Sequence, residues 1–76
     1  MTRAFVLIQT DIKKLPLIIA ELRKIHGVTD AHVLAGPYDA VAHVETDGFE
    51  SLGKLVTGKI QAVDGVTRTL TCPVHL

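Results

Sequence analysis

Apolar and polar positions divide the chain into six segments that alternate between strand and helix periodicity. Residues 4–9 form an unbroken apolar run, which predicts a central strand covered on both faces. Apolar residues then recur at helical spacing over residues 15–25, with Pro16 expected in the first turn and Gly27 as the C-terminal stop. Two strands over 28–35 and 39–45, a second helix from 49 to about 63, and a last strand over 66–74 follow.

The connection Gly36-Pro37-Tyr38-Asp39 separates the second and third predicted strands. If these four residues close a hairpin, Ala35 faces Ala40 and His32 faces His43. The side that holds the alanines is small and apolar, so we expect the helices to pack there. The opposite side combines apolar and ionisable residues, which is typical of a surface that meets another subunit.

The second half of the chain carries three local signals. Asp47 and Glu50 have the spacing of a capping box, which predicts the start of the second helix. Gly53 interrupts the helical pattern, and we interpret it as allowing close approach of the helix to the sheet. Pro73 cannot donate a ladder hydrogen bond, which places the last strand at an edge.

The order of elements is βαββαβ, which predicts an α+β, ferredoxin-like fold of the dimeric α/β barrel type. Two interleaved right-handed crossovers put the first and third strands in the middle of a four-stranded antiparallel sheet, with the second and fourth at its edges. Both helices then cover one face, and the other face, with Leu34 and Val41, stays open. An apolar patch of this kind predicts dimerisation.

Composition narrows the class of protein. The 76 residues form a single domain, residues 1–76, and 47% of them are hydrophobic. So short a chain has a marginal core, and one cysteine, Cys72, excludes an internal disulfide, so we expect self-association. The formal net charge of zero offers no basic face for nucleic acid. Neither a secretory signal nor a membrane span is evident, which indicates a cytoplasmic protein.

The connection at residues 36–39 also holds the main candidate chemistry. A β-turn explains it structurally, because proline presets φ, glycine takes unusual angles and aspartate bonds to its own backbone. A free amino acid explains it functionally, because the ligand ammonium needs a carboxylate, which Asp39 supplies. Amides near Gly36 and the hydroxyls of Thr69 or Thr71 would then receive the ligand carboxylate. Threonine is also a common strand residue, so Thr69 and Thr71 would not suggest a binding site without the loop at residues 36–39.

Metal and catalytic sites find little support. His32 and His43 are expected to be neighbours, but two ligands without a clear third make a poor zinc site, and no cofactor motif is present. Ser51 and Cys72 are the candidate nucleophiles, but neither has a general base at a spacing typical of a catalytic site. We therefore expect that the protein is not an enzyme. The alternative is a small dimeric α+β barrel enzyme, a cofactor-free monooxygenase or isomerase. Aromatic residues make up only 4% of the chain, which leaves little to line such a cavity.

Three segments together resemble one known family. Residues 22–28 (LRKIHGV), 36–39 (GPYD) and 65–71 (GVTRTLT) are similar to the effector-binding domain of the Lrp/AsnC feast/famine transcription regulators. The resemblance implies a dimer formed through the sheets, rings of dimers such as octamers or decamers, and amino acids bound between neighbouring dimers. It places Gly36, Tyr38 and Asp39 at the effector pocket and adds Thr69 and Thr71 from the last strand.

The chain departs from full-length members of that family, which carry an N-terminal helix-turn-helix domain. A strand follows directly after Met1, so the sequence is similar to a stand-alone form of the domain. Such a form is expected not to bind DNA directly, and to modulate a full-length regulator by mixed assembly. Two other roles stay open: binding a metabolite for a purpose unrelated to transcription, and a purely structural partnership with a regulator.

Overall fold

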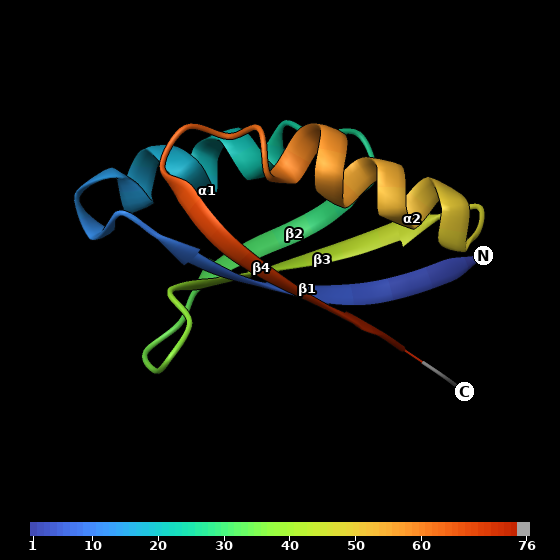
Figure 1. The fold of residues 1–76 in the computed structure, drawn as a ribbon, viewed down its shortest axis with the longest axis horizontal. Helices are drawn as coiled ribbons and strands as arrows, with labels where there is room; N and C mark the ends of the chain where they lie inside the picture. Colours follow the sequence, from blue (N-terminus) through green and yellow to red (C-terminus); the bar gives the residue numbers. More distant parts are fainter. Residues whose placement is uncertain (75–76) are drawn as a thin grey trace.

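The fold has two layers, a four-stranded sheet and a pair of helices that cover one of its faces (Figure 1). The structure, a computed structural model, describes residues 1–74. Its elements in order are β1 (Thr2–Thr10), the 3-10 turn η1 (Ile12–Lys14), α1 (Leu15–Arg23), β2 (Val28–Val33), β3 (Ala40–Thr46), α2 (Phe49–Leu55), the π-helical turn η2 (Val56–Ile60) and β4 (Val66–Pro73). The predicted α+β, βαββαβ architecture is confirmed.

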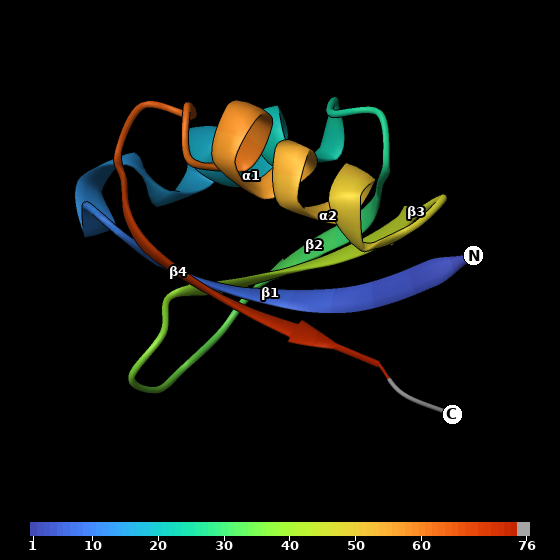
Figure 2. The same ribbon diagram turned by 45° about the vertical axis from the view of Figure 1, so that its right-hand side comes forward.

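The strand order is β2-β3-β1-β4, and every neighbouring pair is antiparallel. β1 and β3 are therefore central, and β2 and β4 form the edges, as the interleaved crossovers predict. Figure 2 shows both helices on the same side of this sheet. Pro73 is the last residue of edge strand β4, where its missing N–H removes no bond to a further strand.

The core lies between the helices and one face of the sheet. In β1, Ala4, Val6 and Ile8 alternate with exposed or half-buried residues, and all three are buried. The alanine-rich side of β2 and β3 faces the same space. The remaining core residues come from the helices and from these strands: Leu15, Ile18, Ile19, Leu22, Ala31, Ala40, Ala42, Val44, Leu52, Leu55, Val56 and Ile60.

The other side of the sheet is uncovered in the single chain. We define the open face as two cross-strand rows, Val41–Leu7–Leu70 and His43–Phe5–Cys72. Phe5 is 43% exposed and Leu70 is 46% exposed. The apolar run in β1 therefore has one face against the helices and the other on this open face, which confirms the predicted patch.

The hairpin register differs from the prediction by two residues. Val33, rather than Ala35, pairs with Ala40, and the Leu34 N–H donates to the Asp39 carbonyl at 2.9 Å. The N–H of Asp39, the last loop residue before β3, donates to the Ile8 carbonyl at 2.8 Å, so the end of the loop is bonded to β1 in this register. An even shift keeps each side chain on its face, which is why the predicted faces survive.

The second helix begins differently from the predicted capping box. Its N-cap is Gly48, which is extended and has no side chain to accept a hydrogen bond, so Asp47 and Glu50 do not form the box. The Thr46 hydroxyl instead donates to the Gly48 carbonyl at 2.9 Å. The interpretation of Gly53 is also wrong, because a Cβ there would meet nothing within 4 Å. No close contact between α2 and the sheet therefore depends on this glycine.

Candidate functional site

The loop between β2 and β3 projects from the end of the sheet, on the side away from the helices (Figure 1). Two side chains anchor it. The Asp39 carboxylate accepts the Thr10 N–H through Oδ2 at 2.8 Å, and the Gln9 amide donates to the Pro37 carbonyl at 3.0 Å. The loop is therefore held against the end of β1. This arrangement presents Tyr38, which is half-buried, beside a fixed carboxylate.

Gly36 plays a smaller conformational part than its residue type suggests. Within residues 1–74, a positive φ occurs at Gly27 and Gly65 and not at Gly36. A Cβ at Gly36 would meet nothing within 4 Å. The expectation that this glycine takes unusual angles is thus wrong, and what it offers is an exposed, uncrowded backbone.

Thr69 and Thr71 lie on the helix side of edge strand β4. They pair with Ile8 and Val6, both of which point into the core. A shallow groove between β4 and the second helix includes both threonines together with Phe49, Leu52 and Val56. The Thr69 hydroxyl accepts a hydrogen bond of 2.9 Å from the Gln61 amide.

The five predicted residues therefore form two separate groups in one chain. Gly36, Tyr38 and Asp39 sit together on the loop, whereas Thr69 and Thr71 line a groove on the other side of the sheet. The strand β1 lies between the two groups in the sheet. The groove that contains Thr69 and Thr71 includes none of the three loop residues.

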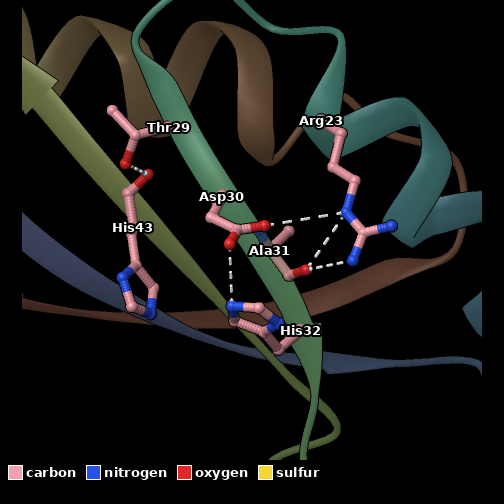
Figure 3. Close-up of polar contacts among 6 residues, drawn as sticks. All are labelled: Arg23, Thr29, Asp30, Ala31, His32 and His43. Carbon is pink, nitrogen blue, oxygen red and sulfur yellow. Dashed lines mark hydrogen bonds and ion pairs between the residues drawn. The ribbon is translucent and has the colours of Figure 1, made fainter.

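A polar cluster on β2 and β3 was only partly anticipated (Figure 3). The two-residue difference in the hairpin register makes Asp30, rather than His32, the partner of His43, and the pairing then becomes irregular between Val28 and Asp30. The predicted direct histidine pair is therefore wrong. The two imidazoles are instead diagonal neighbours, with ring centroids 5.5 Å apart and an interplanar angle of 75°. Thr29, at the irregularity, donates its hydroxyl hydrogen to the His43 carbonyl at 3.1 Å.

Asp30 is the centre of this cluster. One carboxylate oxygen accepts the Ala31 N–H at 2.8 Å, and the other lies 3.0 Å from His32 Nε2. The hydrogen bond from Ala31 holds the pKa of Asp30 below its usual value, desolvation opposes this, and the positive charges of His32 and Arg23 lower it further. Asp30 thus stays ionised at neutral pH.

Arg23 closes the edge of the sheet beside Asp30. Its guanidinium donates to the Ala31 carbonyl at 2.8 Å and 3.2 Å, and lies 3.8 Å from the Asp30 carboxylate. An edge carbonyl that is already bonded is less available to a foreign strand. This contact was not predicted from the sequence, because no local signal pairs Arg23 with a residue eight positions later.

Other kinds of site find no support among residues 1–74. No group of three or more histidine, cysteine, aspartate or glutamate side chains there could hold a metal ion. The hollow beside His43, lined also by Arg3, Phe5 and Glu45, lies at the surface of the open face and is not a closed cavity under the helices. No helix in this part of the chain has the length and apolar character required to cross a membrane.

Comparison with known proteins identifies the class. The family model for the Lrp/AsnC ligand binding domain matches residues 3–75. An uncharacterized HTH-type transcriptional regulator of Pyrococcus furiosus is 34% identical over 73 residues, which are 92% of this chain and 49% of that protein. The chain thus spans about half the length of the curated relatives it matches. It belongs to the Lrp/AsnC ligand binding domain family.

Two solved structures are close in shape. TTHA0845 from Thermus thermophilus superposes with a TM-score of 0.94 at 32% identity, covering 100% of this chain and 95% of that chain. The feast or famine regulatory protein from M. tuberculosis, solved in complex with L-methionine, gives a TM-score of 0.82 at 25% identity, covering 100% of this chain and 51% of that chain. A ligand-binding domain of transcription regulators points away from enzymatic activity.

Proposed function

We propose that the protein binds an amino acid and self-associates as a module of Lrp/AsnC-type transcription regulation, without catalysing a reaction. The observation that carries this proposal is an Lrp/AsnC ligand binding domain match over residues 3–75 in a chain with an uncovered apolar sheet face. The match supports ligand binding and a regulatory role. The uncovered face supports self-association.

The partner at the open face is a second copy of this chain. Phe5 and Leu70 are each more than 40% exposed there, and Leu70 lies in one row with Leu7 and Val41. A small domain gains stability when such a patch is buried, because water is removed from apolar surface. Dimers formed in this way would assemble further into a ring, an octamer or a decamer.

The ligand binds where copies meet. In one chain, the loop group Gly36, Tyr38 and Asp39 and the threonine group Thr69 and Thr71 lie on different sides of the sheet. A pocket that contains both groups needs the loop of one copy and the edge strand of another. This separation favours a pocket that is formed jointly by two copies of the chain, and not a pocket within one subunit.

The chemistry of these residues fits a free amino acid. The Asp39 carboxylate is fixed by Thr10 and can pair with an ammonium group, while the Thr69 and Thr71 hydroxyls and loop amides can donate to a carboxylate. The complex of the M. tuberculosis protein with L-methionine supports the same ligand class.

The module acts beside a helix-turn-helix regulator and not on DNA directly. Eight Lys+Arg balance eight Asp+Glu, so the chain presents no excess of positive charge for phosphates. The curated relatives are HTH-type regulators, which supports mixed assembly with a longer family member in the cytoplasm.

A thermal-shift screen of the twenty amino acids, followed by calorimetric titration, tests the proposal. We expect at least one amino acid to raise the melting temperature of the wild type and to lose most of this effect in a Thr69→Val/Thr71→Val variant. Ser51→Ala, which removes an exposed hydroxyl from α2 outside the groove that holds Thr69 and Thr71, is the matched control and should respond like the wild type. A flat response to all twenty would contradict amino-acid binding.

A further inference from the structure

His43 lies on the open face, and His32 of the neighbouring edge strand β2, the partner of Val41, lies next to it (Figure 3). His43 lies edge-on to Phe5, with ring centroids 4.9 Å apart and an interplanar angle of 88°. His32 lies edge-on to His43 at 5.5 Å. Self-association through the open face, as proposed above, would bury both imidazoles beside apolar neighbours.

Positive charges outnumber negative charges around the two rings when both imidazoles are protonated. When both imidazoles are protonated, they and Arg23 present three positive charges to a single carboxylate, Asp30. Arg23 and the Ala31 N–H already contact that carboxylate, so it cannot fully compensate two further cations. When both imidazoles are neutral, the Arg23 and Asp30 charges balance each other.

The other elements around His43 do not remove this imbalance. From β1, Arg3 faces Glu45 of β3 at 3.2 Å, so these two charges offset each other. From β4, Cys72 lies opposite Phe5 and brings no fixed charge. Among the ion pairs of residues 1–74, Asp30 is therefore the carboxylate next to the imidazoles that Arg3 does not already pair.

We propose that protonation of His32 and His43 opposes self-association through the open face, so that the assembly is tight at neutral pH and loosens in mild acid. This inference rests on the proposed self-association. Its physical basis is the cost of moving two adjacent cations out of water with one shared counter-charge. Histidine is the side chain that ordinarily changes charge between about pH 5 and pH 8, so measurements at about pH 8 and pH 5.5 bracket the response.

Sedimentation velocity at pH 8.0 and pH 5.5, with circular dichroism to verify the fold at both values, tests the inference. For the wild type we expect the association constant to be at least about tenfold lower at pH 5.5 than at pH 8.0. This is the factor that results when one imidazole must lose its proton before two copies associate. His32→Gln/His43→Gln keeps His26 and should lose most of this fall. Asp30→Asn removes the counter-charge and should enlarge it. The single variant His26→Gln should behave like the wild type.

The outcomes separate this inference from the proposed function. Association of the wild type with equal strength at both pH values would overturn the inference and leave self-association intact. An equal fall in the wild type and the double variant would overturn it as well, because other groups would then be responsible. A wild type that is monomeric at both pH values would contradict self-association itself, and with it the inference.

Discussion

The carboxylate of Asp39 accepts a hydrogen bond of 2.8 Å from the backbone N–H of Thr10. This bond ties the β2–β3 loop to the end of the neighbouring central strand, 29 positions away in sequence. This carboxylate completes the backbone bonding of β1, and in the proposed function it also pairs with the ammonium group of the ligand. The two tasks make different demands on the side chain.

Two substitutions at Asp39 separate those tasks. Asp39→Ala leaves the Thr10 N–H without its acceptor and should lower the free energy of unfolding by about 1–3 kcal/mol. Asp39→Asn keeps an oxygen acceptor and should lower it by less, yet should abolish amino-acid binding because the charge is gone. Urea denaturation and calorimetric titration measure the two effects. Equal losses of stability in both variants would contradict the capping role, and retained binding in Asp39→Asn would contradict the ligand role.

The open face should control the mass of the particle. Leu70→Lys places a charge among apolar side chains and should shift the protein toward the monomer at micromolar concentration. Leu17→Lys is the matched control, because Leu17 is 71% exposed but lies on α1, on the helix side. Light scattering coupled to size exclusion compares them. If Leu17→Lys dissociates the dimer and Leu70→Lys does not, the assigned surface is wrong.

Two glycines should respond in opposite ways to alanine. Gly65 has φ +96°, and a Cβ there would lie 2.9 Å from Ile18 Cδ1, so Gly65→Ala should destabilise the fold by more than about 1 kcal/mol. Gly53 lies in a helix with open space around it, so Gly53→Ala should stabilise by about 0.5–1 kcal/mol. Chemical denaturation at one protein concentration ranks the two variants. A stabilising Gly65→Ala would refute the geometry of this turn.

Asp30 should make stability depend on pH in acid. The Ala31 N–H lowers the pKa of Asp30 in the folded protein, so folding favours the ionised carboxylate. This contribution is complete above the unfolded pKa of about 3.9 and is lost as the pH falls through the lower folded value. The wild type should therefore exceed Asp30→Asn in stability at pH 7, and the gap should narrow near pH 2.5. A gap that is constant across this range would exclude the ionised carboxylate as its source.

Periodicity predicted the fold because each element has one dominant face. The apolar run of β1, the stripe from Leu15 to Leu22 and the edge position of Pro73 all follow from local rules, and together with the crossover rule they predict the layers and the strand order that the structure has. The hairpin register did not follow, because it depends on Asp39 bonding to Ile8 and Thr10 in a distant strand. The capping box failed for a similar reason, since the chain enters α2 through an extended Gly48.

The candidate site was predictable in type but not in arrangement. The loop sequence indicated a carboxylate beside an open backbone, and that is what Asp39 and Gly36 provide. The placement of Thr69 on the helix side depends on strand pairing with Ile8, which no local motif encodes. The contact of Arg23 with the Ala31 carbonyl was missed because it links a helix to an edge strand through side-chain reach alone.

Sedimentation of the unmodified protein at micromolar concentration and neutral pH tests the central claim most directly. The account predicts a particle with at least twice the chain mass of 8.2 kDa, because an uncovered apolar face should not persist in water. A well-folded species that sediments at 8.2 kDa would contradict both the assembly and the shared ligand pocket.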